Sequence, residues 1–135
     1  WVVGAQKDDG SFVQKVAVPD NVLDEDFYVR YYQGEATYAL TKLYQATQNT
    51  NNKKTKDGTV SSSSPTVDEA TRESWLTVAE SAADFIVARD SELSDDELPV
   101  DHWLMYGVAE LIHLQRITPS SSSSLKLLQH ALRLV

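Results

Sequence analysis

Two carboxylates stand at matching places in the sequence, each in the first turn of a predicted apolar helix. Glu35 opens the helix expected at about 34–48, and Asp101 opens the one expected at about 101–115. If these helices pack side by side, their axes lie about 8–10 Å apart, and the two acids can stand within the ~5–9.5 Å that separates glycosidase acid/base pairs. The alternative is that both are ordinary helix-terminal acids, favoured by the helix dipole, with Asp101 as an N-cap.

Side chains suited to holding a sugar flank these acids. Tyr31, Tyr32 and Trp103 have flat apolar faces with polar tips, and His102 can donate to a hydroxyl group or carry a proton near neutral pH. We therefore predict the two acids as catalytic candidates and these four residues as substrate-binding candidates. The alternatives are core packing for the rings and a capping or surface role for His102.

The remaining histidines indicate less chemistry. Glu110 and His113 have a spacing that binds metal when two copies converge, but no second copy is visible, so we expect a buried hydrogen-bonded pair. His130 is expected at the surface. The sequence contains no P-loop and no dinucleotide-binding glycine motif. No metal or cofactor is predicted.

Apolar periodicity predicts four helices that position these residues. The first and third are given above, the second begins at a Thr66–Glu69 capping box, and the fourth covers about 125–135. The polar stretch 49–64 has no apolar period and is predicted to be a mobile loop. Near the N-terminus, Asp9-Gly10 predicts a turn between short extended pieces, and an acidic loop is expected at 20–30.

The helices alternate in character. From Trp103 to Leu114 only Glu110 and His113 are clearly polar, which predicts a helix buried on several sides. The helices that follow the first and third are amphipathic. This pattern predicts two αα-hairpins in series, about 34–89 and 101–135, with inner helices covered by outer ones. A weak echo of 38–44 in 106–112 is consistent with a repeat.

Charge and composition exclude several classes of function. The 135-residue chain has a net charge of −8, which disfavours nucleic acids and anionic membranes. Its apolar runs are shorter than the roughly 20 residues that span a bilayer. The absence of cysteine excludes disulfides and thiolate chemistry but does not indicate in which cellular compartment the protein is found. Trp1 and Val135 suggest a piece of a larger protein, whose remaining hairpins would be its partners.

Three motifs resemble those of (α/α) toroid enzymes, most nearly the six-hairpin glycosidase-like proteins. They are Gln6-x-x-Asp9-Gly10-Ser11-Phe12, Tyr31-Tyr32-Gln33-Gly34-Glu35-Ala36 and Asp101-His102-Trp103. The resemblance covers roughly two thirds of the chain, which departs from the pattern in its Asn/Ser loop and its serine tract. It implies a substrate cleft at one mouth of the ring, lined by the loops that enter the inner helices. The six candidate site residues fall there.

We therefore expect an all-α fragment of an (α/α)6 toroid with a short extended N-terminal segment. The first hypothesis for its function is binding of an oligosaccharide, with or without hydrolase, lyase or epimerase chemistry. The second is a non-catalytic helical-repeat scaffold for protein binding, and the third is a toroid of the terpenoid-cyclase or prenyltransferase type. Acid/base catalysis requires both acids to open into one pocket, whereas a scaffold predicts that they cap amides or face solvent singly.

Overall fold

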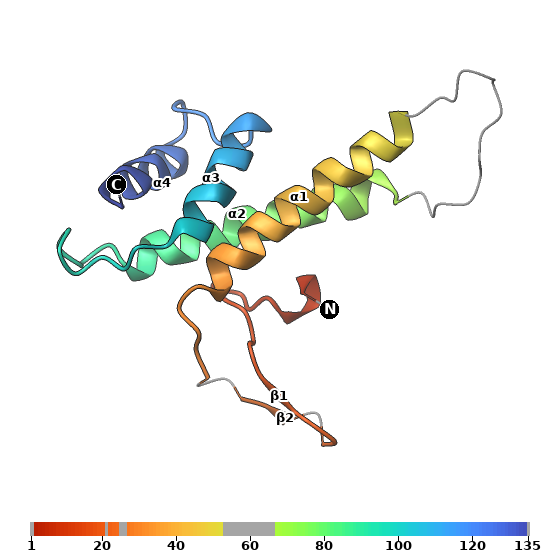
Figure 1. Ribbon diagram of the computed structural model, residues 1–135, viewed down its shortest axis with the longest axis horizontal. Helices are drawn as coiled ribbons and strands as arrows, with labels where there is room; N and C mark the ends of the chain where they lie inside the picture. The colour runs from red at the N-terminus through yellow and green to blue at the C-terminus, as the bar shows by residue number, and fades with distance from the viewer. Residues whose placement is uncertain (1, 21, 25–26, 53–66, 135) are drawn as a thin grey trace.

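Two long helices lie antiparallel and carry the rest of the molecule (Figure 1). The computed structural model describes residues 2–20, 22–24, 27–52 and 67–134. In this part of the chain the fold is mostly helical, with α1 (Tyr32–Asn52), α2 (Glu69–Arg89), α3 (His102–His113) and α4 (Ser122–Arg133). A short 3-10 turn, η1 (Val3–Ala5), precedes them. The prediction of four helices is confirmed.

Side-chain caps determine where α2, α3 and α4 begin; the cap of α3 is Asp101, which is described with the candidate site. Asp68 accepts the Thr71 amide at 2.9 Å and is the N-cap of α2; the Thr66 of the predicted capping box lies outside the described residues. Ser121 accepts the Ser124 amide at 3.1 Å, and α4 therefore begins three residues earlier than predicted. The hydroxyl and carboxylate oxygens satisfy amides that have no partner within the helix.

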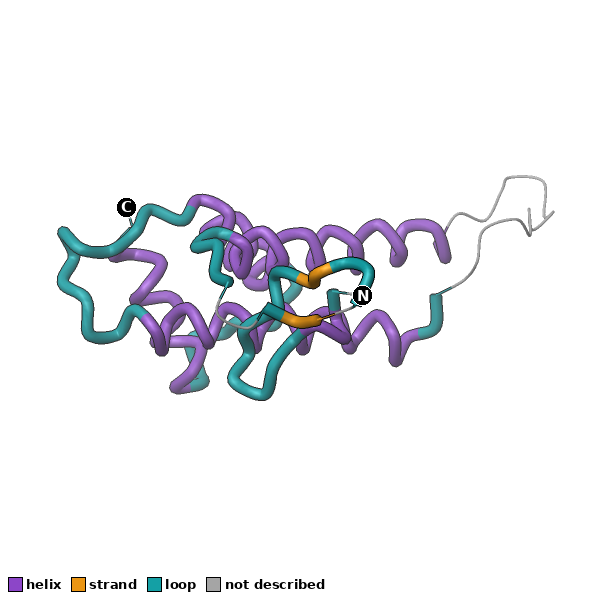
Figure 2. Tube along the Cα trace, turned by 90° about the horizontal axis from the view of Figure 1, so that it is seen from below, coloured by secondary structure: helices purple, strands orange, loops and turns teal. Residues whose placement is uncertain are grey.

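The first helix is longer than its apolar pattern indicated. The periodicity ends near residue 48, but α1 continues to Asn52. Residues 49–52, predicted as the beginning of a mobile loop, are therefore helical, and residues 53–64 lie outside the described residues. At their far ends α1 and α2 extend beyond the two shorter helices (Figure 2).

The core lies where α1, α2 and α3 meet. Its fully buried large side chains include Leu76 and Ile86 of α2 and Leu104 and Leu111 of α3. The buried residues of α3 follow one face at helical spacing. Away from this face Tyr106 is 54% and Ile112 43% exposed. The prediction that this helix is buried on several sides is therefore wrong, because its buried residues lie on one face only.

Glycines allow α1 and α3 to approach closely. A Cβ on Gly34 would lie 2.7 Å from both Asp101 Oδ1 and the Leu104 nitrogen, and a Cβ on Gly107 would lie 2.7 Å from Thr37 Cγ2. Each glycine thus meets the backbone or a short side chain of the opposite helix. The two contacts fix the N-terminal end of α3 against the first turns of α1.

The predicted turn at Asp9-Gly10 is confirmed, and it is attached to α2. Gly10 has a φ of 90°, a left-handed conformation that glycine adopts without strain. The Gln6 amide donates to the carbonyl oxygens of Gly10 (3.1 Å) and Val78 (2.9 Å). Phe12, at the end of the turn, is 3% exposed within the core. The motif therefore anchors the N-terminal segment to the helices.

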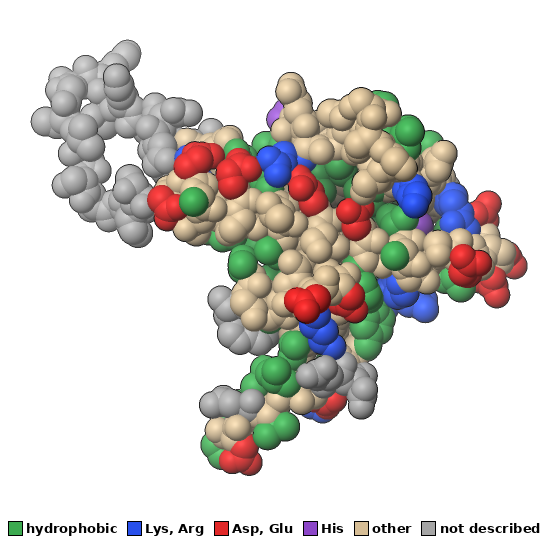
Figure 3. All heavy atoms as spheres, turned by 180° about the vertical axis from the view of Figure 1, so that it is seen from behind, with side chains coloured by type: hydrophobic (Ala, Val, Ile, Leu, Met, Phe, Trp, Pro, Cys, Tyr) green, Lys and Arg blue, Asp and Glu red, His purple; other side chains and the backbone are tan. Residues whose placement is uncertain are grey.

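A small antiparallel hairpin projects from the helical body. It consists of β1 (Val16–Ala17) and β2 (Val22–Leu23), with Val16 paired to Leu23. β2 lies within the segment predicted as an acidic loop. Hydrophobic side chains of this arm are exposed, among them Val18 at 85% (Figure 3). No helix in the described part of the chain is long and apolar enough to cross a membrane.

Candidate functional site

Asp101 caps α3 and is buried beneath α1. Its Oδ1 accepts the Leu104 amide at 3.0 Å, and the residue is only 2% exposed. Burial raises the pKa of this carboxyl group, and the backbone hydrogen bond from Leu104 opposes that rise because it favours the charged form. The geometry is that of the N-cap which the sequence offered as the alternative to catalysis.

Glu35 is placed differently, although it belongs to the same end of the molecule. It lies in the first turn of α1, next to the glycine that contacts Asp101, and its side chain is exposed. The two acids therefore do not present their carboxylates to one shared surface. Glu35 is accessible to a ligand, and Asp101 is covered.

Five rings gather on the surface formed by α1 and α3. Tyr31 immediately precedes α1, Tyr38 belongs to α1, and His102, Trp103 and Tyr106 come from α3. Ring centroids are separated by 5.9 Å for Tyr38–Trp103, 5.7 Å for Tyr38–Tyr106 and 6.5 Å for Tyr31–His102. We call these five residues the aromatic cluster. Three of the four predicted sugar-binding residues belong to it.

The fourth, Tyr32, lies elsewhere. Its ring meets Phe12 edge-on at 5.8 Å and packs against the core. Burial, and to a smaller degree the charge of Glu35, raise the pKa of its hydroxyl group. Tyr32 follows Tyr31 by one residue, and successive helical side chains point in different directions, so only one of the pair can face α3.

Two members of the aromatic cluster were not among the predicted site residues. Tyr38 follows Tyr31 by seven residues and therefore returns to the same face of α1. Tyr106 follows His102 by four residues on α3. The sequence signal was present in the repeat, where Tyr38 aligns with Tyr106.

The rings of the aromatic cluster leave their polar groups free. In the described part of the chain no hydrogen bond joins the hydroxyls of Tyr31, Tyr38 and Tyr106, the His102 imidazole or the Trp103 indole to another protein group. Tyr31 and Tyr106 are 42% and 54% exposed. The aromatic cluster therefore combines apolar faces with unused donors and acceptors, the combination that suits a ligand rich in hydroxyl groups.

The surface between α1 and α3 continues beyond the rings to a polar network. The Lys42 ammonium donates to Glu110 Oε1 at 3.1 Å and to Gln45 Oε1 at 2.8 Å, and the Gln45 amide donates to the second oxygen of Glu110. The hydrogen bond from Gln45, followed by Lys42, lowers the pKa of Glu110. His113, expected to pair with Glu110 in the interior, is exposed.

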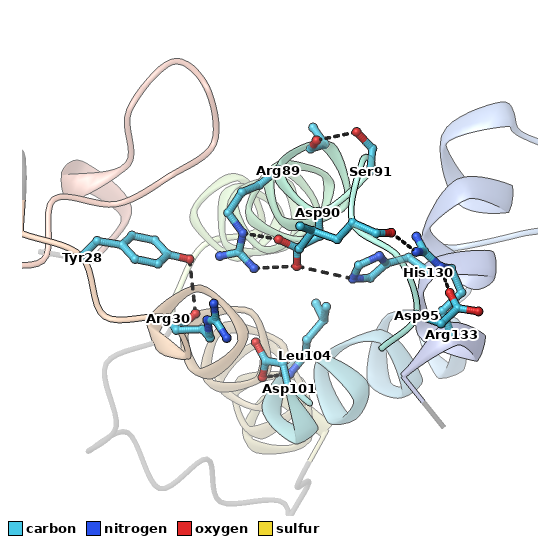
Figure 4. Close-up of polar contacts among 12 residues, drawn as sticks. Tyr28, Arg30, Arg89, Asp90, Ser91, Asp95, Asp101, Leu104, His130 and Arg133 are labelled. Carbon is cyan, nitrogen blue, oxygen red and sulfur yellow. Dashed lines mark hydrogen bonds and ion pairs between the residues drawn. The ribbon is translucent and has the colours of Figure 1, made fainter. Parts of the chain in front are cut away.

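A second polar group is buried where α2 ends and α4 packs (Figure 4). The Arg89 guanidinium binds both oxygens of Asp90, at 2.5 and 2.7 Å, and His130 Nε2 lies 4.0 Å from Asp90 Oδ2. His130 is only 3% exposed, so its expected surface position is wrong. Burial lowers its pKa and outweighs the opposing charge of Asp90.

Arg116 joins α2 to the segment that follows α3. Its guanidinium binds Glu80 Oε1 at 2.5 Å and Glu73 Oε2 at 2.9 Å. Figure 3 shows acidic and basic side chains interspersed along this face. Such pairs at a partly exposed surface contribute little to stability individually, and they leave the α2 face hydrated.

Comparisons with known proteins identify no relative: no family model, no curated protein and no solved structure matches this chain. Among the described residues no group of three or more histidines and carboxylates is arranged to hold a metal ion. The aromatic cluster, with Glu35 beside it, is therefore the candidate site that the geometry itself provides.

Proposed function

We propose that the aromatic cluster is a carbohydrate-binding platform. The observation that carries the proposal is the convergence of five exposed or half-exposed rings whose polar groups make no hydrogen bond to any residue that the structure describes. A sugar ring stacks its C–H face on an aromatic ring while its hydroxyls bind to polar groups at the edge. This surface has both kinds of group.

Glu35 completes the proposed platform. Tyr31, just before α1, and Glu35 and Tyr38 within it are spaced by four and three residues, so their side chains follow one face of the helix. An exposed carboxylate beside stacked rings can accept hydrogen bonds from two sugar hydroxyls. We assign it this binding role, because the second acid that acid/base catalysis would use is engaged as a cap.

The toroid architecture remains part of the proposal. In that arrangement α1 and α3 are neighbouring inner helices, and α2 and α4 lie outside them. The close glycine contacts between α1 and α3 support this assignment. So do the exposed positions on α3, Ile112 among them, which would be covered by the next inner helix.

The second candidate function is a helical scaffold that binds protein. The observation that favours it is the exposed apolar flank of α3, where Ile112 is 43% exposed, together with Val100 at 67% just before the helix. Exposed apolar side chains at both ends of a helix can be covered by a protein partner that lies along it. This flank lies on a different side of α3 from Trp103, so the two proposals can be tested separately.

A matched pair of tyrosine variants tests carbohydrate binding. Tyr106 belongs to the aromatic cluster, and Tyr28 lies outside it with a comparable exposure of 45%. Isothermal titration with disaccharides and hexasaccharides of the cello, malto, manno and xylo series identifies a binding sugar. Tyr106→Ser is expected to weaken that binding about tenfold, or ~1.4 kcal/mol, through loss of a stacking face.

Tyr28→Ser is the control and is expected to bind within about twofold of the parent protein. Equal losses in both variants would mean that the sugar does not sit on the aromatic cluster. If none of the four series binds, carbohydrate binding is excluded for neutral glucans, mannans and xylans. The scaffold proposal then takes precedence.

A further inference from the structure

The surface between α1 and α3 does not end at the aromatic cluster. Residue 31 just before α1 and residues 35, 38, 42 and 45 within it follow one another by four, three, four and three positions, the spacing of a single stripe along a helix. On α3 the stripe runs through residues 102, 106, 110 and 113. The two stripes face each other, because Tyr38 contacts Tyr106 and Lys42 binds Glu110.

The far part of this surface is polar. We call Lys42, Gln45, Glu110 and His113 the polar end. These residues line a hollow of about 530 Å³, one helical turn beyond Tyr38 and Tyr106, or roughly 5–6 Å. From His102 to His113 the surface between α1 and α3 follows α3 for about 16 Å. A ligand stacked on the rings would therefore reach the polar end if it were an extended chain.

The charges of the polar end cancel. Glu110 binds Lys42, and the lowered pKa of Glu110 keeps its carboxylate ionised at neutral pH, so the pair persists. The Lys42 ammonium and the Gln45 amide each retain an N–H that no described residue uses. The polar end thus offers donors without net charge. Glu35 and the overall charge of −8 disfavour an anionic chain.

We propose that the surface between α1 and α3 binds an uncharged, linear oligosaccharide along its length, with one part stacked on the aromatic cluster and a later part hydrogen-bonded in the hollow at the polar end. This inference depends on the proposed carbohydrate-binding function and specifies its ligand. It differs from that function in requiring contacts one turn beyond the rings. A ligand confined to the rings would not need the polar end.

Chain length and position together test the inference. The disaccharide and hexasaccharide of the neutral series that binds are titrated against the parent protein, Gln45→Ala and Gln129→Ala. Gln129 is an exposed glutamine on α4 and serves as the matched control. The parent is expected to bind the hexasaccharide about tenfold more tightly than the disaccharide, a gain of ~1.4 kcal/mol from the added contacts.

Gln45→Ala is expected to reduce this advantage to about threefold or less while leaving disaccharide affinity unchanged, and Gln129→Ala is expected to change neither. A hexasaccharide that binds no more tightly than the disaccharide would overturn the extended binding site. So would equal losses for both ligands in Gln45→Ala. Either result leaves the platform intact if Tyr106→Ser still weakens the disaccharide, whereas no binding by any sugar overturns both proposals.

A charged chain gives an independent check. Glu110→Gln keeps the hydrogen-bonding shape of the polar end but leaves Lys42 without its carboxylate. The parent protein is expected to bind oligogalacturonate, an anionic hexasaccharide, about tenfold more weakly than the neutral one, and Glu110→Gln is expected to remove most of that difference. Preference for the anionic chain in the parent protein would overturn the neutral-ligand assignment.

Discussion

Gly34→Ala is expected to lower the free energy of unfolding by about 2–4 kcal/mol, although alanine is the better helix former. In an open helix position the same change stabilises by roughly 1 kcal/mol. Here the new methyl group would lie 2.7 Å from the Leu104 nitrogen and within 2.8 Å of both Asp101 oxygens. It would therefore force α1 away from α3 and disturb the cap of α3.

Gly4→Ala is the matched control, because a Cβ there meets nothing within 4 Å. Both substitutions reduce the freedom of the unfolded chain equally, so their difference reports the native-state contact. Urea denaturation followed by circular dichroism measures both variants. Equal midpoints for Gly34→Ala and Gly4→Ala would mean that the helices do not approach as closely as the structure has them.

The same crossing can be tested from the other helix. A Cβ on Gly107 would lie 2.7 Å from Cγ2 of Thr37, a buried residue. Thr37→Ser removes that methyl group and keeps the hydroxyl, which donates to the Gln33 carbonyl at 2.8 Å. The double variant is expected to recover at least about 1 kcal/mol relative to Gly107→Ala. No coupling between the two sites would contradict the contact.

Acidification is expected to destabilise the protein through His130. Its pKa in the folded state is lowered from 6.5, chiefly by burial, so below pH 6.5 the unfolded chain binds more protons than the folded one. The stabilisation that comes from this shifted pKa of His130 is present above pH 6.5. It is lost as the pH falls toward the pKa of His130 in the folded state. The free energy of unfolding should fall by up to ~1.4 kcal/mol per pH unit in that window.

Charged groups surround this histidine on three elements. Asp90 and Arg89 come from the end of α2, Asp101 from the start of α3, and Arg133 from α4 itself. Asp101 changes the stability with pH in the opposite direction, because its pKa is raised in the folded state. Its stabilising effect is present at low pH and is lost as the pH rises through the pKa that Asp101 has in the folded protein. A variant that removes only His130 separates the two contributions.

Urea titrations between about pH 7.5 and 5.5 test this expectation. His130→Gln should lose the additional acid sensitivity, and His113→Gln, which changes an exposed histidine, should follow the parent protein. If the free energy of unfolding of His130→Gln depends on pH in the same way as that of the parent protein, the buried imidazole does not titrate as described. Side-chain NMR of the two histidines would then give their pKa values directly.

The sequence predicted the helices better than their surroundings. Periodic apolar residues and the Asp101 cap were sufficient to place α3, because both signals are local. The end of α1 was missed, because residues 49–52 are polar and carry no period. His130 was misplaced for a related reason: its burial depends on Asp90 and α4 meeting across 40 residues, which no local pattern contains.

The candidate site was predicted in part. Tyr31, His102 and Trp103 lie together as expected, whereas the pairing of Glu35 with Asp101 depended on which way each side chain turns. A helix-terminal acid can cap its own helix or face a neighbour, and only the packing of Gly34 against Asp101 decides between them. Tyr38 and Tyr106 could have been identified from spacing alone.

Because α1 and α2 have 21 residues and α3 and α4 only 12, amide hydrogen exchange should be graded along the long helices. The overhanging ends have fewer neighbours to hold them and should open first. The aromatic cluster lies at the opposite end, where α3 is fixed against α1. Its rings are thus ordered before any ligand arrives, so that a ligand bound there loses little affinity to immobilising the protein.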